Sequence, residues 1–219
     1  MKTLKCSRLS TTYQNCPPSY TRILHAAPDM PPVDVYVNGN PVAMNLAYKQ
    51  TAGYFTVSPC TYHIKIFPSG KKYGECPIAE ACFEICAKTA TTFAFLGDCR
   101  CGTGLLGIQE IFDPCRRLRE RCKAYVRFIN LSPNSPPLDV AIVGGTRLFR
   151  NVPYTTHTKY TPVDPGTYVF QLRPAGSRQQ GVASAPVTLE RGTTSTVYAL
   201  GNVGGTPPLE TIATVDGNY

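Results

Sequence analysis

Residues 25–39 read HAAPDMPPVDVYVNG, and residues 130–144 read NLSPNSPPLDVAIVG. In both stretches a Pro-Pro pair precedes a short strand-like run that contains one Asp and ends at a glycine. Prolines and glycines of this kind bound strands and set turns. The two stretches therefore predict one strand–loop–strand unit that occurs twice.

The duplication extends well beyond this unit. Residues 20–23 match 125–128, and seven further residues of the first half recur in the second with nearly the same offset. They are Tyr54, Val57, Pro59, Thr61, Tyr62, Pro68 and Gly70, which match Tyr160, Val163, Pro165, Thr167, Tyr168, Pro174 and Gly176. Unrelated strands would not keep such a register, so we expect two homologous modules. The predicted organisation is an arm (1–19), module one (20–113), a basic linker (114–124) and module two (125–219).

Composition favours strands and turns. The 219 residues include no Trp, 13 Tyr, 20 Pro and 18 Gly, and 16% are charged. In module one we expect strands near 20–26, 33–38, 41–47, 52–57, 60–67, 81–88, 91–97 and 105–112. In module two we expect them near 125–131, 138–143, 146–152, 158–163, 167–173, 183–189, 194–200 and 209–215. The predicted fold is all-β, with two tandem antiparallel β-sandwich modules of immunoglobulin-like architecture.

The charge distribution argues against a nucleic-acid partner. The net charge is +8, and the excess lies in the arm, at +3, and in the linker, at +4. The basic run at 116–121 contains no aromatic residue. Nucleic-acid binding would favour aromatic residues between the basic ones. It reads as a solvated linker, with polyanion binding as the alternative. No apolar run is long enough to span a membrane, and no signal peptide follows the first basic residues.

Cysteines are confined to the first 122 residues. They are Cys6, Cys16, Cys60, Cys76, Cys82, Cys86, Cys99, Cys101, Cys115 and Cys122. Module two shares the strand pattern but has none, so we infer that the sandwich does not need disulfides to fold. The spacings do not fit the paired knuckles of a zinc site, which favours disulfides or cross-links over a metal site or free thiols. Cys115 and Cys122 could close a loop within the linker, whereas Cys99 and Cys101 are too close in sequence to bridge each other without strain.

No motif indicates catalysis or a cofactor. The three histidines, His25, His63 and His157, lie far apart in the sequence, and no nucleophile elbow, zinc-binding helix or phosphate loop is present. Asp34 and Asp139 recur beside a turn, where a carboxylate usually accepts hydrogen bonds from loop backbone. We therefore expect no enzyme and no cofactor, whereas the many tyrosines leave carbohydrate binding open.

The arm has two interpretations. Residues 3–13 are rich in strand-forming residues and contain no Gly or Pro. The segment is either a frayed terminus or a strand that adds to the sheet edge of a neighbouring subunit. Cys6 and Cys16 favour the second interpretation, since a free tail has little use for two thiols.

The motif at 25–39, together with Tyr54, the Pro68-x-Gly70 turn and the run at 166–168, resembles a bacterial domain of unknown function. That domain occurs as tandem β-sandwich repeats on exported or surface proteins, and the match is looser in module two. The resemblance implies a fold and a surface location but no catalytic or ligand residues. Family members usually carry an export signal and few cysteines, so this chain departs from them. Its cysteine-bearing arm is similar in architecture to subunits of disulfide-locked spore appendages and other extracellular fibres.

These features predict a non-enzymatic structural subunit that assembles head-to-tail on a bacterial cell or spore surface. The arm would dock on a neighbour and lock to its thiols, and other surface or spore-coat proteins are further candidate partners. The alternative is a monomeric surface adhesion or ligand-binding module whose cysteines pair internally. A third hypothesis is a metal-binding or redox protein.

Overall fold

The computed structural model describes residues 3–4, 18–71, 75–98, 102–111, 122–177 and 181–217. The chain divides near residue 113 into two compact units, which correspond to the two expected modules. Neither unit contains a helix in its described residues. None of the described segments is therefore a helix with the length and hydrophobicity that a membrane crossing requires.

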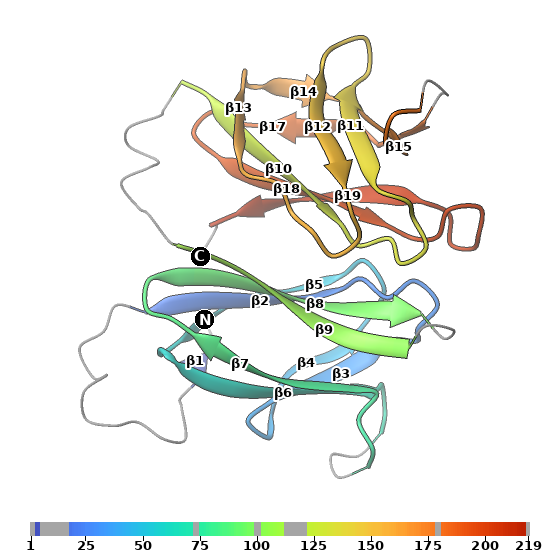
Figure 1. Ribbon diagram of the computed structural model, residues 1–219. Coiled ribbons are helices and arrows are strands. Elements are labelled where there is room, and N and C mark those ends of the chain that lie inside the picture. The colour runs from blue at the N-terminus through green and yellow to red at the C-terminus, as the bar shows by residue number, and fades with distance from the viewer. Residues whose placement is uncertain are drawn as a thin grey trace. The chain divides into compact units, whose positions relative to one another are not determined.

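Module one is built from two sheets (Figure 1). The first has the order β1 (Thr3–Leu4), β5 (Thr51–Val57), β2 (Ser19–His25), β8 (Thr89–Asp98) and β9 (Gly102–Ile111). The second has the order β4 (Asn40–Leu46), β3 (Val33–Val37), β6 (Cys60–Pro68) and β7 (Ala79–Ile85).

Module two repeats this plan with shorter strands. One sheet has the order β13 (Thr161–Val163), β10 (Ala124–Asn130), β18 (Thr194–Leu200) and β19 (Glu210–Asp216). A second has the order β12 (Arg147–Val152), β11 (Leu138–Ile142), β15 (Phe170–Pro174) and β16 (Val182–Ala183). β14 (Gly166–Tyr168) and β17 (Val187–Leu189) pair with each other.

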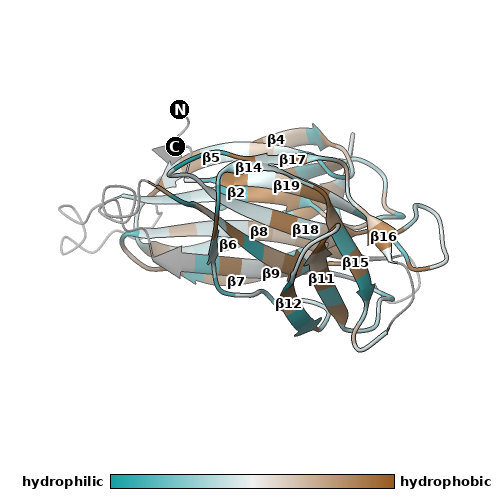
Figure 2. Cartoon of the chain, turned by 90° about the horizontal axis from the view of Figure 1, so that it is seen from above, coloured by the Kyte–Doolittle hydropathy of each residue, from teal (hydrophilic) through white to brown (hydrophobic). Residues whose placement is uncertain are grey.

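Each module has its own apolar core. Alternation of apolar and polar residues turns one face of each strand inward, and Figure 2 shows it as brown and teal bands along β12 and β15. In module one the core gathers Ile23, Val35, Ile64, Ile66, Phe93 and Phe95 among others, and in module two Phe128, Val140, Phe170, Leu172 and Val197 among others. The expected all-β architecture with two modules is confirmed.

The strand pairing differs from the expectation in one respect. β1 pairs with β5, β2 with β8 and β10 with β18 in parallel, whereas the sequence predicts antiparallel sandwiches. Between β2 and β8 the chain passes through β3 and β4 of the other sheet, returns to β5, and crosses again through β6 and β7. A crossover of this length permits parallel pairing, which a tight hairpin does not.

Two expected strands of module two are each divided. The strand expected at 167–173 becomes β14 and β15, and the one expected at 183–189 becomes β16 and β17. The first divides at Val169, whose carbonyl accepts a hydrogen bond from the Val143 N–H outside the ladder. The second divides before Val187, where Pro186 has no N–H to give to a partner strand.

The Asn38-Gly39 pair forms the hairpin turn that the sequence predicts. Both residues have positive φ, 49° and 78°, as the type I′ turn between β3 and β4 requires. The Asn38 side chain also accepts a hydrogen bond from the His63 N–H at 2.9 Å, which ties the turn to β6.

A buried carboxylate binds the same backbone positions in both modules. Asp34 is 2% exposed and accepts hydrogen bonds from the Asn45 N–H at 2.8 Å, the Gly70 N–H at 3.0 Å and the Ser69 hydroxyl at 3.2 Å. Asn45 and Gly70 both have positive φ, 54° and 84°. The prediction that this carboxylate bonds loop backbone is therefore confirmed.

Asp139 repeats these contacts and adds an ion pair. It accepts from the Asn151 N–H at 2.8 Å and the Gly176 N–H at 3.3 Å, and Arg147 Nη1 lies 2.6 Å from its Oδ2. Burial alone would raise the pKa of Asp139, but the two backbone N–H groups and Arg147 outweigh it, so the pKa lies below its ordinary value.

One equivalent position differs in chemistry between the modules. His25 is fully buried, its Nε2 lies 3.1 Å from the Pro31 carbonyl, and its Nδ1 has no hydrogen-bond partner in the described structure. The counterpart Asn130 donates to the Val152 carbonyl at 3.1 Å and accepts from the Ser132 N–H at 3.1 Å. Both side chains fix the proline loop, but only His25 does so with a titratable ring.

Removing the buried carboxylate should destabilise either module strongly. We expect Asp34→Ala and Asp139→Ala each to lower the free energy of unfolding by about 3 kcal/mol, because several buried donors lose a charged acceptor. Urea unfolding followed by circular dichroism measures the change. Asp164→Ala is the matched control and should cost far less, since its side chain is 78% exposed and pairs with Lys123 at the surface. Equal losses for the buried and exposed sites would contradict the assigned role.

His25 should make module one sensitive to mild acid. Burial lowers the pKa of His25 below its ordinary 6.5, so the unfolded chain binds a proton at a pH where the native ring does not. The contribution of neutral His25 to the free energy of unfolding is complete above about pH 6.5. It is lost as the pH falls below 6.5 and through the lower pKa of the native ring. We expect His25→Asn, the residue of module two, to reduce the slope of unfolding free energy between pH 7.5 and 5. An unchanged slope, or an NMR titration of the native ring at or above pH 6.5, would refute this.

Candidate functional site

The outer face of β7 carries a row of thiols and carboxylates. Residues 79, 81, 83 and 85 point into module one, and the alternate residues Glu80, Cys82 and Glu84 are exposed. Cys86 follows directly after the strand and is also exposed. β7 is the last strand of its sheet, so this row lies on an edge of the module.

Four of the predicted cysteines are free and exposed, namely Cys76, Cys82, Cys86 and Cys122. Cys60, at the start of β6, is disulfide-bonded. The other five candidates, Cys6, Cys16, Cys99, Cys101 and Cys115, lie outside the described residues. Because Cys122 is free, the loop closure expected between Cys115 and Cys122 is not formed in this structure.

The spacing of Cys82 and Cys86 prevents them from bridging each other. Four residues of extended chain separate their Cα atoms by about 13 Å, whereas a disulfide needs less than about 7 Å. Each of these thiols therefore requires a partner from elsewhere in order to form a disulfide.

Polar groups surround Cys82. It lies directly opposite His63 in the β6–β7 register. His63 Nε2 lies 3.5 Å from Glu80 Oε2, and Lys65 Nζ lies 3.4 Å from the same oxygen. The thiol is thus accessible to solvent on a hydrophilic surface, and solvent access is one condition for thiol–disulfide exchange.

The remaining candidates do not form a reactive centre with this row. His25 is buried in the core of module one, and His157 bridges Ile129 through its backbone in module two. Asp34 and Asp139 are fully used in holding turns. Within the described ranges, no three His, Cys, Asp or Glu side chains lie close enough to hold a metal ion.

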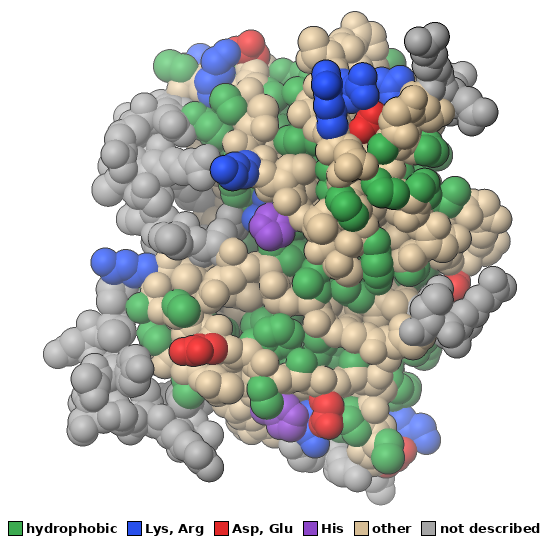
Figure 3. Space-filling model, viewed as in Figure 1, with side chains coloured by type: hydrophobic (Ala, Val, Ile, Leu, Met, Phe, Trp, Pro, Cys, Tyr) green, Lys and Arg blue, Asp and Glu red, His purple; other side chains and the backbone are tan. Residues whose placement is uncertain are grey.

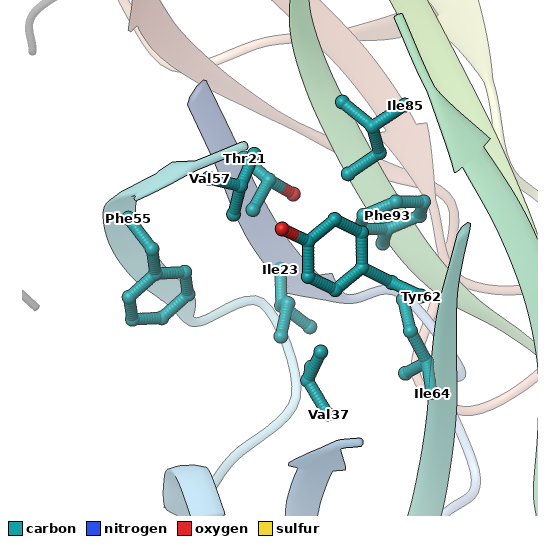
Figure 4. A pocket seen from close by; sticks show the side chains of 9 residues that line it. All are labelled: Thr21, Ile23, Val37, Phe55, Val57, Tyr62, Ile64, Ile85 and Phe93. Atoms are coloured by element: carbon teal, nitrogen blue, oxygen red, sulfur yellow. The ribbon is translucent and has the colours of Figure 1, made fainter. Parts of the chain in front are cut away.

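Module one has only a small internal cavity at the site that Figure 4 shows. Tyr62 lies at its centre, with Ile23, Val57 and Phe93 among the side chains around the ring. The Tyr62 hydroxyl donates to the Ser58 carbonyl at 2.9 Å, and burial raises the pKa of this tyrosine. The cavity volume is about 10 Å³, the lower limit for a single water, and the lining is apolar. It is a packing defect and has no room for a ligand.

Module two has a much larger open groove. It lies between β17 and β19 and has a volume of about 430 Å³. Its lining is uncharged, with the aliphatic side chains of Val187, Ala213 and Val215 and the hydroxyl-bearing Ser195 and Thr211. The sequence did not predict this groove. Its signal is a smaller residue in module two, since Val187 lies opposite Tyr168 where Phe83 lies opposite Tyr62 in module one.

The surface itself is sparsely charged. On the face drawn in Figure 3, the charged side chains are few and are scattered among polar and apolar groups. This agrees with the 16% charged residues of the chain. Long-range electrostatic attraction is therefore a weak guide to the kind of partner, and local contacts are a better one.

Two solved structures have distant similarity to the chain. "The Bacillus anthracis TIE protein" is 9% identical with a TM-score of 0.28, and the chain covers 34% of its length while 90% of the chain is matched. A family CBM26 module of Eubacterium rectale Amy13K, solved with maltoheptaose, is 10% identical with a TM-score of 0.25. That match covers 92% of the chain and 97% of the module. No curated protein matches the sequence significantly.

A family model matches both modules. It covers residues 19–110 and again residues 124–218, so nearly all of the chain lies within two copies. The repeat that the sequence predicts and the two sandwiches of the structure are thus the same two units. The chain belongs to the family described as "Domain of unknown function (DUF4397)", which it carries in tandem.

Proposed function

We propose that the chain is a non-enzymatic structural subunit that assembles with its own copies on a bacterial cell or spore surface. The observation that carries this proposal is the row of exposed free thiols on the edge of module one. Cys82 and Cys86 are accessible and cannot pair with each other. Exposed thiols that lack an internal partner are suited to joining one molecule to another.

The cross-link is an oxidation of two thiols to one disulfide. A thiolate of one subunit attacks a small-molecule disulfide, such as oxidised glutathione, and releases one glutathione thiol. A thiolate of the neighbouring subunit then attacks the mixed disulfide and releases the second. Two protons leave the protein, and the glutathione disulfide takes up the two electrons.

The arm supplies the non-covalent contact in this proposal. Its residues Thr3 and Leu4 form β1, which pairs in parallel with Thr56 and Val57 of β5. The arm therefore has strand-forming capacity at a sheet edge, and a strand that pairs within one chain can pair equally well between chains. A head-to-tail contact of this kind gives filaments or rings.

The second candidate is a monomeric surface adhesion or ligand-binding module. The groove of about 430 Å³ in module two favours it, together with the disulfide at Cys60. In that case the remaining thiols would pair internally, and the oxidised protein would stay a monomer.

Oxidation should convert the protein into a ladder of covalent multimers. We expect full-length protein treated with oxidised glutathione to run on a non-reducing gel at multiples of 23.9 kDa. The double variant Cys82→Ser, Cys86→Ser should lose most of the ladder, about tenfold, because the edge thiols are gone. Cys122→Ser, also an exposed thiol but outside this row, is the matched control.

Electron microscopy of the same samples separates the two candidates. Filaments or rings that disappear with reductant and on removal of residues 1–17 support the structural subunit. Dispersed monomers from oxidised wild-type protein would refute it and favour the adhesion module. A ladder that persists in the double variant would show that other thiols carry the cross-link.

A further inference from the structure

The free edge of β7 offers backbone groups to an added strand. β7 is the last strand of its sheet, and Cys82 lies opposite His63 of β6. The His63 C=O accepts from the Asn38 N–H at 2.8 Å, and the His63 N–H donates to Asn38 Oδ1 at 2.9 Å. Both groups of His63 thus point away from β7, so in this antiparallel ladder the N–H and C=O of Cys82 point away from β6. Glu80 and Glu84, two residues to either side, have the same orientation.

This edge is open in the part of the chain that the structure describes. There, the backbone N–H and C=O groups of Glu80, Cys82 and Glu84 have no hydrogen-bond partner. The exposed Glu84 carboxylate also has no hydrogen bond or ion pair with any described residue. Glu80, in contrast, is shared by His63 and Lys65. The edge therefore presents open main-chain groups, one free thiol and one unpaired carboxylate.

β7 is held firmly at this edge by an aromatic ring. Phe83 packs against Phe93, with the ring centroids 4.7 Å apart. A Cβ atom added to Gly107 of β9 would lie 3.0 Å from the Phe83 ring, so the glycine leaves the space that the ring needs. Module two has Val187 and Val197 at the two ring positions. An added strand would thus find a well-anchored template in module one.

The counterpart edge of module two is a poorer acceptor. β17 has only three residues, Val187–Leu189. Pro186 precedes it and has no N–H to offer to an added strand. The strand also contains no cysteine. The acceptor edge with a thiol is therefore that of module one.

Charge argues against a second β7 strand as the occupant. Antiparallel pairing of two copies about Cys82 would place Glu80 of one copy opposite Glu84 of the other. Like charges that lie directly opposite each other destabilise a sheet. The edge instead favours a basic strand with a thiol of its own.

We propose that the edge of β7 receives residues 5–9 of a second copy as a parallel strand, with Arg8 opposite Glu84 and a disulfide between Cys6 and Cys82. The proposal rests on the proposed function and names the acceptor strand and the thiols that join two subunits.

The chemistry of the segment fits the edge. Residues 5–9 read KCSRL, with two cations and no acid. Cys6 and Arg8 lie on one side of an extended strand, as Cys82 and Glu84 do. The parallel sense places Arg8 at the unpaired Glu84, whereas the antiparallel sense would place it at Glu80, which already has partners. Main-chain pairing supplies the affinity, and the ion pair fixes the register.

The geometry also suits a disulfide. Neighbouring strands lie about 4.8 Å apart, which is within the range of Cα separations, about 4.4 to 6.8 Å, that a disulfide spans. The Cys6 thiolate attacks glutathione disulfide and releases one glutathione thiolate. The Cys82 thiolate then attacks the Cys6 sulfur and releases the second. One S–S bond breaks, one forms, and the two cysteines lose two protons.

This link must join two chains. β1 and β9 lie at opposite edges of one sheet, four strand spacings or about 19 Å apart, and β7 packs beside β9. Cys6 follows Leu4 of β1 by two residues, which span only about 7 Å. The nine residues 10–18 then span up to about 30 Å on the way back to β2. An arm that binds a different strand of the next copy makes a heterologous contact, which extends into a filament or closes as a ring.

Mapping the disulfides tests the link directly. Equal amounts of unlabelled and ¹⁵N-labelled full-length protein are oxidised together with glutathione disulfide and digested without reduction. We expect mass spectrometry to find Cys6 joined to Cys82 in peptide pairs that combine the two isotopes. A ladder in which Cys6 is joined instead to another cysteine, such as Cys60 of its own chain, would overturn this assignment and leave the proposed function standing.

Charge reversal tests the register. Arg8→Glu and Glu84→Arg should each slow formation of the ladder by about threefold, because like charges then face each other. The double variant should recover the wild-type rate, since the pair is restored with its charges exchanged. Glu190→Arg, at an exposed acidic residue of module two, is the control and should behave as the wild type does. Unchanged rates in the single variants, or no recovery in the double variant, would overturn the register.

A peptide experiment tests the edge without requiring assembly. The probe is a peptide of residues 1–10 whose Cys6 carries thionitrobenzoate as a mixed disulfide, added to full-length protein with its free thiols reduced. We expect it to label Cys82 about tenfold faster than Cys76, Cys86 or Cys122, which are also exposed, and the Arg8→Glu peptide to lose this preference. If wild-type protein never assembles, the proposed function fails, whereas selective labelling of Cys82 still supports the edge. Equal labelling of the four thiols overturns it.

Discussion

The buried carboxylate of Asp34, repeated at Asp139, is the constraint on which each module depends. It accepts from two backbone N–H groups that are far apart in sequence, one within an edge strand, at Asn45 or Asn151, and one in a turn, at Gly70 or Gly176. These four residues all have positive φ, which costs energy for asparagine and is free for glycine. One charged acceptor thus ties the start of the central strand of the second sheet to both of its neighbours, at the end where Val33 pairs with Leu46 and Pro68.

Much of this could be predicted from sequence because it is repeated. Asp34 and Asp139, Gly70 and Gly176, and Tyr62 and Tyr168 recur at a nearly constant offset, and a strand's position follows from its alternation and bounding turns. The parallel pairing of β2 with β8 could not be predicted, since periodicity describes a strand and not its neighbour. The states of the thiols were also hidden, because pairing depends on the distance between side chains that lie many residues apart.

The groove shows a different limit of sequence reasoning. Phe83, Phe93 and Gly107 come from three strands and meet only after folding, so the loss of two rings in module two reads as conservative apolar change. Val187 and Val197 keep the pattern of the strand intact while they remove the volume that closes the edge. The apolar–polar pattern of a segment predicts its secondary structure. A groove depends on the volumes of side chains from several strands, and the strand register is needed to know which side chains meet.

The two modules therefore keep one framework and differ at one edge. In module one the edge strand β7 turns Phe83 inward, which seals the sandwich, and turns Cys82 outward. In module two the counterpart strand is interrupted at Pro186, carries Val187 inward and contains no cysteine. The first edge is sealed and carries an exposed thiol, whereas the second edge leaves an open groove and carries no thiol. The two edges can differ in this way because the contacts of Asp34 and Asp139 lie away from them, in the turns and edge strands β4 and β12.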